Sequence, residues 1–381
     1  MRKAVVIAIA TLVLWGCAKS APQTAPGDEL DLSAAVKRVA NDLAQQLGPA
    51  AESRTLVIDP LLDHATGQQT NVSARVEEEI RPALAAGLKG VTIVPFNGEG
   101  AAKSRLVVTG TIATTGTPDQ LSMSVALTDR QTGLVVAQSA ARFRAVGFDG
   151  APTPFYNDSP SLVRDRSVDG YLRTSETPAG KPADALYVAQ VPTAAVLADA
   201  LAAYNAGRWD QALAGYNAAA SRPDGQQLRT FNGLYLSNMR LGRTDAAEDA
   251  FGKIAALGLA TNNLSVKLLF RPGSIEFWPD PAVSGAYPMW LRQIARAVRA
   301  SSTCLNVVGH TSRTGSEAVN DRLSLARATA VRDRLDKEVP GLARQSRVSG
   351  VGFRENLIGS GADDASDALD RRVEFKVVAC S

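Results

Sequence analysis

The spacing of apolar residues divides the chain into stretches of helical and of strand periodicity. Residues 30–47 have apolar positions three and four apart, as on one face of a helix, and a Gly-Pro pair ends the pattern. A strand pattern at 54–63 and a helical pattern at 73–88 follow. Alternating runs between 91 and 144 predict further strands separated by Gly, Pro and Asp turns. We therefore expect an α/β domain over 30–146.

The middle of the chain changes character twice. Residues 147–192 are rich in proline and have little apolar periodicity, so we expect a linker with some irregular structure. Residues 193–260 are rich in alanine and helical, and two stretches align at an offset of 35 residues. This offset resembles that of tetratricopeptide repeats, whose small residues let paired helices pack closely. The aligned pairs are Gly207 with Gly242, Ala212 with Ala247, and Tyr216 with Phe251.

The role of these two helical units stays open at this point. Two units are fewer than an independent solenoid needs. The first interpretation is a pair of helical hairpins docked on a neighbouring domain. The second is a peptide-binding groove for another protein of the cell envelope.

The last third of the chain, 264–381, has the pattern β-α-β-α-β-β. Its long helix is expected over 316–338. Because apolar residues recur there at helical spacing, we expect a buried stripe of Val319, Leu323, Ala326 and Ala330. A polar stripe beside it, Asn320, Ser324 and Arg327, should lie at the edge of the sheet.

The first residues predict export. Met1-Arg2-Lys3 is a positive n-region, and Ala4 to Trp15 is an apolar run too short to span a bilayer. Leu14-Trp15-Gly16-Cys17 resembles the lipobox of bacterial lipoproteins. This resemblance implies a signal peptide over 1–16 and a Cys17 that carries acyl chains, palmitate among them. Two or three acyl chains anchor a protein stably, so 17–29 would be a tether to the outer membrane. The alternative is an ordinary secretory signal with a chance cysteine.

Composition excludes several classes of function. The formal net charge of +3 is too small for a nucleic-acid footprint. The chain has two histidines, no G-x-S-x-G, no P-loop and no paired metal ligands, so we expect neither an enzyme nor a cofactor. His64 lies in a turn-like segment and is expected to be solvated.

Three blocks near the C-terminus resemble a known family. They are G-H-T at 309–311, N-x-x-L-S-x-x-R-A at 320–328 and R-R-V-E-F at 371–375. Together they resemble the OmpA-like C-terminal domain, which also occurs in peptidoglycan-associated lipoprotein and in MotB. The resemblance implies non-covalent binding of peptidoglycan at the diaminopimelate residue of its stem peptide. A weaker, topological resemblance links 30–146 to the N-terminal domain of TolB.

The resemblance also assigns roles to residues. Arg327 falls on the arginine that takes a ligand carboxylate, which a planar guanidinium can do bidentately. Asn320 would hold the turn and the ligand, and the alternative for Arg327 is a surface pair with Asp321 or Asp333. The predicted peptidoglycan-binding set is Thr311, Ser312, Asn320, Ser324, Arg327, Asp370, Arg371 and Arg372.

Two positions depart from the family pattern. Ser312 stands where the family usually has the aspartate that takes the ligand's ammonium, and Asp370 stands where it usually has asparagine. Asp370 could supply the missing carboxylate, as could Asp363 or Asp364. The alternative is a scaffold or assembly lipoprotein of an envelope machine, whose C-terminal domain has given up diaminopimelate.

The two cysteines near the C-terminus predict a disulfide. With Cys17 acylated, Cys304 and Cys380 remain in an oxidising compartment, where two cysteines most simply form one disulfide. The alternative is a pair of buried free thiols. The expected fold is therefore multidomain α+β: an α/β domain, a short all-α tetratricopeptide-like segment and an OmpA-like βαβαββ mixed-sheet domain. The expected function is an outer-membrane lipoprotein that faces the periplasm and tethers the envelope to the cell wall.

Overall fold

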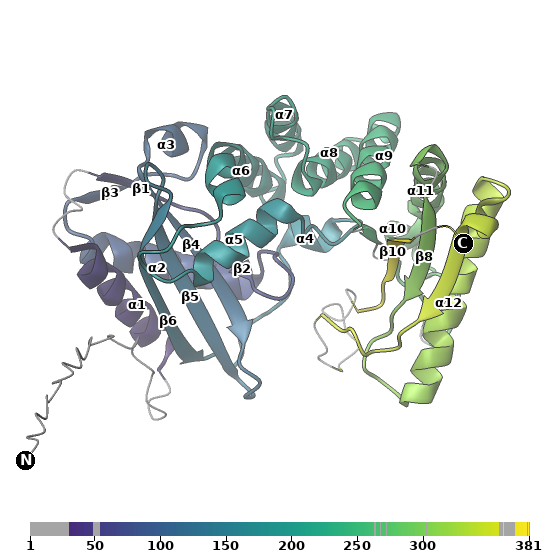
Figure 1. The fold of residues 1–381 in the computed structure, drawn as a ribbon, viewed down its shortest axis with the longest axis horizontal. Helices are drawn as coiled ribbons and strands as arrows, with labels where there is room; N and C mark the ends of the chain where they lie inside the picture. The colour runs from purple at the N-terminus through teal and green to yellow at the C-terminus, as the bar shows by residue number, and fades with distance from the viewer. Residues whose placement is uncertain are drawn as a thin grey trace, which may run out of the picture.

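The structure is a computed structural model that describes residues 30–48, 54–262, 264–266, 268–271, 273–301, 303–357, 361, 370–378 and 380. Figure 1 shows three parts side by side: an N-terminal sheet domain, a layer of helices and a C-terminal domain. The predicted signal peptide, Cys17 and the whole of the predicted tether lie outside the described residues.

The N-terminal domain is built on a six-stranded sheet with the order β3-β1-β4-β5-β6, in which β2 also pairs with β4. β1 is parallel to β3 and β4, whereas β4, β5 and β6 form an antiparallel meander. The strands are β1 (Arg54–Ile58), β2 (Leu62–Asp63), β3 (Val91–Ile93), β4 (Leu106–Thr114), β5 (Gln120–Asp129) and β6 (Leu134–Arg144).

Both faces of this sheet are covered, and the cover comes from different parts of the chain. Leu56 and Ile58 pack with α1 (Leu32–Leu47) and α2 (Asn71–Gly87), while Val57 points to the opposite face. The second face is covered by α3 (Gly98–Lys103) and by helices that follow residue 146. The predicted boundary at 146 is therefore not a boundary of the hydrophobic core.

The proline-rich segment 147–192 is folded against its neighbours. It contains α4 (Pro154–Asp158), α5 (Arg166–Glu176) and the start of α6 (Ala185–Asn205). Phe155 is fully buried, its amide donates to Asn205 Oδ1 (2.9 Å), and Tyr204 donates to Asp158 Oδ2 (2.8 Å). The segment expected to be a linker is thus part of the core, because its aromatic and apolar residues pack on the helical layer.

α6 belongs to two hydrophobic cores. Tyr187 and Val191 pack on the N-terminal sheet, whereas Ala200 and Tyr204 pack in the helical layer. Among the described helices, α6 is the one long and apolar enough to cross a bilayer by length and composition. In this structure its apolar residues are divided between the two cores.

The helical layer contains two similar hairpins, α6 with α7 (Trp209–Ala220) and α8 (Leu228–Arg240) with α9 (Thr244–Ala260). The predicted offset of 35 residues appears in their turns. Gly207 and Gly242 have φ of +73° and +70°, and the arginine after each donates to a carbonyl five residues earlier, at 2.9 Å in both hairpins. Glycine adopts this left-handed conformation without steric cost.

The helical layer continues into the C-terminal domain through α11 (Tyr287–Ser301). The ring of Trp290 stacks on Phe251 with centroids 5.5 Å apart, and its Nε1 donates to Tyr235 Oη (2.8 Å). Glu248 of α9 accepts two hydrogen bonds from Arg292 (2.9 and 2.8 Å). The hairpins are therefore docked on neighbours at both ends, as the first of the two interpretations expected.

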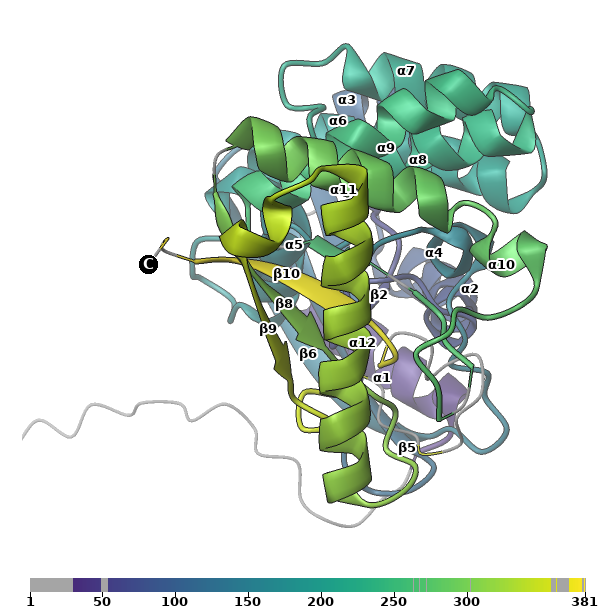
Figure 2. The same cartoon turned by 90° about the vertical axis from the view of Figure 1, so that its right-hand side faces the viewer.

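The C-terminal domain has the predicted β-α-β-α-β-β order. Its four-stranded sheet has the order β7-β10-β8-β9, with β8 parallel to β9 and β10 antiparallel to both of its neighbours. Figure 2 shows α12 lying across this sheet. The elements are β7 (Leu264–Val266), α10 (Pro281–Ser284), α11, β8 (Cys304–Gly309), α12 (Glu317–Glu338), a 3-10 turn (Leu342–Gln345), β9 (Ser346–Gly350) and β10 (Val373–Val378).

The predicted buried stripe of α12 is wrong by one position. Val319 is 49% exposed, and Leu323, Ala326 and Ala330 are only half-buried. The helix packs on the sheet through Ala328, Val331 and Leu335. These residues lie on the same face of the helix as the polar stripe that was expected at the edge of the sheet. The apolar pattern misleads here because the turn of the helix nearest the strand ends buries polar residues.

Candidate functional site

The candidate site lies where β8 and β9 end beneath α12. A Cβ on Gly309 would lie 2.1 Å from the carbonyl oxygen of Ser324, and a Cβ on Gly350 would lie 2.3 Å from the amide nitrogen of Leu325. Both distances are shorter than any real contact, so only glycine lets the helix approach the strand ends this closely. The glycine of the G-H-T motif therefore has a packing role.

Asn320 holds the turn that leads into α12. Its Nδ2 donates to the carbonyl oxygens of Thr314 (2.8 Å) and Ser316 (3.2 Å). The side chain is 4% exposed, and Gly315 in the turn has a φ of +87°. Asn320 thus fixes the 314–316 turn, as the sequence predicted, through bonds made inside the protein.

Arg327 points inward and is 3% exposed. Its Nε donates to the carbonyl oxygen of Ser274 (3.2 Å), its Nη2 donates to that of Arg271 (3.4 Å), and its guanidinium lies 4.8 Å from the centre of the Phe270 ring. The alternative partners have other ion pairs: Asp321 with Arg354 (2.6 Å) and Asp333 with Arg332 (2.7 Å). Arg327 is therefore an interior cation at the site, not part of a surface pair on the helix.

Thr311 and Ser312 form the wall opposite the helix. The Thr311 amide donates to the carbonyl oxygen of Gly352 (2.9 Å), while its hydroxyl is buried and has no hydrogen-bond partner among the described residues. The Ser312 side chain is 6% exposed, and its hydroxyl lies 3.4 Å from that of Thr314. This wall therefore offers neutral hydroxyl groups.

Ser324 has a positioning role. Its hydroxyl donates to the carbonyl oxygen of Asp321 (2.9 Å) and accepts from the amide of Gly352 (3.0 Å). The residue is fully buried. Ser324 therefore fixes the 350–352 backbone, and its place in the peptidoglycan-binding set stays a prediction.

Asp370 is engaged by the protein itself. It is fully buried, its Oδ1 accepts from the amide of Leu357 (2.6 Å), and its Oδ2 accepts from Nδ2 of Asn356 (3.1 Å). A carboxylate used in this way holds the 356–357 backbone, and its role as a replacement for a ligand-binding aspartate stays a prediction. Asp363 and Asp364 lie outside the described residues.

The two arginines of the last strand differ in burial. Arg372 is 4% exposed and donates twice to Glu374 Oε1 (2.9 and 2.7 Å) and once to the carbonyl oxygen of Glu355 (3.2 Å). Arg371 is half-buried. Arg372 therefore supports the loop before the last strand.

Glu374 is a site residue that the sequence analysis did not single out, although it is the glutamate of the quoted R-R-V-E-F block. Its Oε2 lies 3.4 Å from Nε2 of His310, which is 1% exposed. Burial works to raise the pKa of Glu374, but the contact with His310 and the charge of Arg372 prevail and hold that pKa well below its usual range. Glu374 is thus ionised and paired. We call Thr311, Arg327, Asp370, Arg372 and Glu374 the strand-end cluster.

One group among the described residues brings three potential metal ligands together. Atoms of His310, Glu355 and Glu374 lie within 4.8 Å of one another. Lys376 Nζ lies 3.6 Å from Glu355 Oε2 and 3.4 Å from Glu374 Oε2. The ammonium of Lys376 therefore already supplies the positive charge that a metal ion would bring.

The two remaining cysteines of the sequence form a disulfide. Cys304 opens β8, and its register partner on antiparallel β10 is Val378, so Cys380 reaches it across the strand ends. The two Cα atoms are 5.2 Å apart. The predicted disulfide is confirmed. His64, the other histidine, lies 3.1 Å from Glu176 at the surface of the N-terminal domain.

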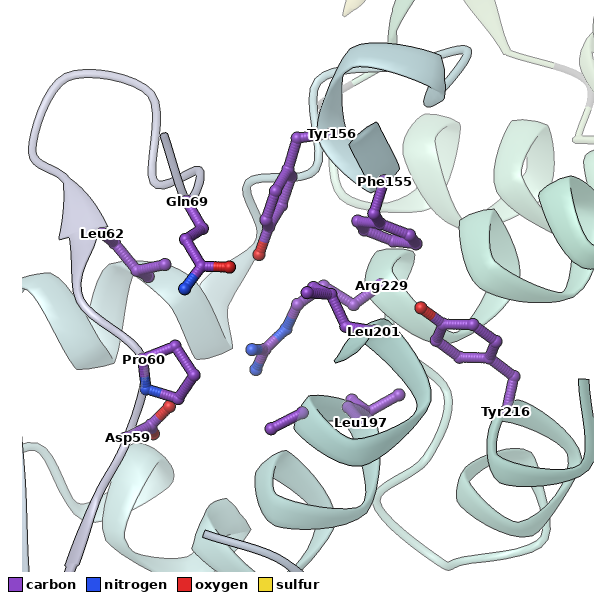
Figure 3. Close-up of a pocket in the computed structure, with 11 residues that line it drawn as sticks. Asp59, Pro60, Leu62, Gln69, Phe155, Tyr156, Leu197, Leu201, Tyr216 and Arg229 are labelled. Carbon is purple, nitrogen blue, oxygen red and sulfur yellow. The ribbon is translucent and has the colours of Figure 1, made fainter. Parts of the chain in front are cut away.

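A second buried polar group lies where the N-terminal domain meets the helical layer. Asp59 follows β1, is 4% exposed and accepts a hydrogen bond from Tyr187 Oη (2.9 Å). Figure 3 shows Arg229 of α8 and the hydroxyl of Tyr156 directed into the same space. A cavity of about 20 Å³ lies between them, with room for about one water molecule. We call Asp59, Tyr156, Tyr187 and Arg229 the junction cluster.

The junction cluster differs from the strand-end cluster in its electrostatics. Burial raises the pKa of Asp59 to about 7 and outweighs the charge of Arg229 and the hydrogen bond from Tyr187. Arg229 Nε and the hydroxyl of Tyr216 have no hydrogen-bond partner among the described residues. The sequence analysis missed this cluster, and its one local signal is an aspartate directly after an apolar strand.

The OmpA family matches residues 270–368, which include Thr311 and Arg327 of the strand-end cluster. The C-terminal domain is OmpA-like. Outer membrane porin F of Pseudomonas aeruginosa is 40% identical to the chain over 79 residues, which are 20% of this chain and 22% of the porin. This chain therefore matches less than two thirds of the porin's length.

Solved structures that resemble the chain each match 30% of it. The peptidoglycan-associated lipoprotein of Burkholderia pseudomallei is 25% identical, is covered over 89% of its length and has a TM-score of 0.26. The cell wall anchor of the T6SS from Pseudomonas aeruginosa is 26% identical, is covered over 80% and has a TM-score of 0.25.

Proposed function

We propose that this protein is an outer-membrane lipoprotein whose OmpA-like domain binds peptidoglycan non-covalently and so tethers the envelope to the cell wall. In this proposal Cys17 is acylated and anchored in outer-membrane lipid, and the folded part faces the periplasm. The protein acts by binding, without catalysis. The family match and the similarity to an outer-membrane porin support a place in the envelope.

The observation that supports binding most directly is the buried guanidinium of Arg327 beside the strand ends. Its two described bonds are to neutral carbonyl oxygens, at 3.2 and 3.4 Å. A ligand carboxylate would make shorter, charge-assisted bonds with this guanidinium, roughly twice as strong as bonds to a neutral carbonyl oxygen. The turn fixed by Asn320 and the backbone fixed by Ser324 keep the two walls of the site in place.

Diaminopimelate of the stem peptide is the ligand that this arrangement suits. It presents a carboxylate, which the planar guanidinium of Arg327 can take bidentately. The N-terminus of α12 and the arginines of the last strand keep the surroundings positive. Thr311 and Ser312 provide hydroxyl groups for the remaining polar atoms of the ligand.

Co-sedimentation of the full chain with purified diaminopimelate-type sacculi tests the proposal. The wild type should pellet, and Arg327→Lys, which keeps the charge but loses the planar fork, should pellet at least about tenfold less well. Arg332→Ala is a matched control on the same helix, because Arg332 pairs with Asp333 away from the site. Thermal melts of each variant separate loss of binding from loss of folding.

The rival function is a scaffold whose OmpA-like domain no longer holds peptidoglycan. Its support is the continuous packing of α9 on α11, which would fix the N-terminal domain relative to the C-terminal one. If the wild type stays in the supernatant while Ser312→Asp pellets, the fold is intact, the ligand has been given up and the scaffold proposal replaces the tether.

A further inference from the structure

The parallel part of the N-terminal sheet reverses its strand order at β1. The chain runs from β1 to β3 on one side, and then from β3 to β4 on the other side of β1. The two connecting helices cover opposite faces of the sheet, because α2 packs with Leu56 and Ile58, whereas α3 packs with Val57. In open α/β sheets, ligands bind in the crevice outside the carboxyl ends of the strands at such a reversal.

A groove of about 570 Å³ lies at this place in the N-terminal domain. It is lined by residues that follow β1 and β3, by α2, and by α6 of the helical layer. Three prolines, Pro60, Pro82 and Pro95, contribute rigid apolar surface to it. Pro82 and Pro95 are exposed, so the groove is open to solvent.

The charged residues that line the groove are Glu77, Arg81 and Asp199. Glu77 and Arg81, both on α2, form an ion pair at 3.1 Å. Asp199 on α6 lies across from them, and partial burial raises its pKa. Burial also raises the pKa of Glu77, in spite of the charge of Arg81. The lining therefore carries one negative charge in excess, and a bound cation would stabilise the ionised form of both carboxyl groups.

We propose that this groove binds an extended segment of a partner protein that carries a lysine or arginine between apolar residues. The cationic tip lies beside Asp199, and the apolar residues on either side of it lie on the prolines. Long basic side chains suit such a surface because they combine an apolar stem with a charged tip.

The shape of the groove favours a peptide over a small molecule. A site for a small molecule usually encloses most of its ligand. This groove is exposed along Pro82, Pro95 and Asp199, so a ligand that runs across it would remain partly in solvent. The site lies in the N-terminal domain and is independent of the proposed binding of peptidoglycan.

The test is selection from a displayed library of random nine-residue peptides on the immobilised full chain, followed by fluorescence anisotropy with each selected peptide. The selected peptides should share a lysine or arginine flanked by apolar residues. Asp199→Lys should weaken their binding at least about tenfold, because it replaces attraction by repulsion. Asp249→Lys, which makes the same change at an exposed position of α9 outside the groove, is the matched control and should bind as the wild type does.

A second variant tests the groove without changing its charge. Ala202 is exposed and lines the groove, so Ala202→Trp should fill part of it and weaken binding while thermal melts stay unchanged. Arg327→Lys should leave peptide binding intact, which separates this site from the strand-end cluster. Selected peptides without a basic residue, binding that Asp199→Lys leaves unchanged, or a library without any enriched peptide would each overturn the inference.

Discussion

The protein buries two polar groups that differ in how their charges are satisfied. In the strand-end cluster, Arg372 and Glu374 meet at 2.7 Å, and the pKa of Glu374 lies well below its usual range. In the junction cluster, Asp59 has a tyrosine hydroxyl as its close partner, and burial raises its pKa to about 7. Burial acts on both carboxyl groups, so direct pairing with a cation decides the sign of the shift.

This contrast separates a site prepared for a ligand from a contact between domains. The strand-end cluster fixes its carboxylates on its own backbone and cations, beside the guanidinium of Arg327 that is proposed to take a ligand carboxylate. At the junction cluster, Arg229 Nε and the hydroxyl of Tyr216 have no hydrogen-bond partner within the described residues, and a cavity of about 20 Å³ lies there. Its role is to join the N-terminal domain to the helical layer, where one water molecule can complete the hydrogen bonds.

Breaking the ion pair of the strand-end cluster should have the largest effect on stability. Arg372→Ala leaves Glu374 buried without its guanidinium partner and should cost about 3–5 kcal/mol in the free energy of unfolding. Asp59→Asn, which keeps the shape at the junction, should cost far less at pH 7. Urea denaturation of the two variants measures the difference. An equal loss in the free energy of unfolding for both variants would show that the two buried carboxyl groups are not stabilised in different ways.

Loss of the disulfide should have the second-largest effect on stability. Cys304 and Cys380 are separated by 76 residues, and a cross-link over such a loop contributes about 4 kcal/mol in the chain-entropy model. Cys304→Ser should therefore lower the urea midpoint of the C-terminal domain while leaving the junction unchanged. Hydrogen exchange of β8 and β4 amides reports the two regions separately. An equal loss of protection in β8 and β4 would contradict the view that the two clusters are stabilised independently.

The two clusters should respond to pH in opposite directions. The folded protein holds a proton on Asp59 that the unfolded chain releases above about pH 4, so this contribution to stability falls as pH rises from about 4 to 7. Glu374 stays ionised when folded, so its contribution is present above about pH 4.5 and falls as the solution becomes more acidic.

Urea midpoints from pH 3 to pH 8 test this pair of slopes. Asp59→Asn should flatten the decline above pH 4, and Glu374→Gln should remove part of the loss in acid. A wild type whose stability rises steadily from pH 5 to pH 7 while Asp59→Asn is flat would reverse the assignment for Asp59.

A smaller effect is expected at the contact between α9 and α11. Hydrogen bonds from Arg292 and Gln293 lower the pKa of Glu248 to about 2. Glu248→Gln should cost about 1.5–3 kcal/mol, because it removes the charge from these bonds. Limited proteolysis of the 261–286 region should then become faster. Glu78→Gln, on exposed surface far from this contact, is the control.

The strand-end cluster could largely be found from the sequence, because its residues lie in three short blocks with local roles. Asn320 was correctly expected to hold its turn. The partners of Asp370, Asn356 and Leu357, could not be predicted, because they are set by the path of a loop that periodicity does not reveal. The stripe of α12 was misplaced because Asn320, Ser324 and Arg327 are buried despite their polarity.

The junction cluster could not be found from the sequence. Asp59 and Arg229 are brought together by the packing of α6 and α8 on the end of β1, and nothing near either residue in the sequence indicates the other. The same holds for residues 147–192, where proline suggested a linker but buried aromatic residues decide the packing. In contrast, the two glycine turns of the helical hairpins follow directly from their 35-residue offset.

The central claim is that Arg327 binds a stem-peptide carboxylate. The direct measurement is the Nε–H resonance of Arg327 in the full chain labelled with ¹⁵N-arginine. The resonance is assigned with Arg327→Lys and titrated with the synthetic tripeptide alanyl-γ-glutamyl-diaminopimelate. The account predicts a saturable shift of the Arg327 resonance, while the Arg372 resonance, fixed by Glu374, stays in place. A shift confined to other arginines, or no shift at concentrations where sacculi pellet the protein, would contradict it.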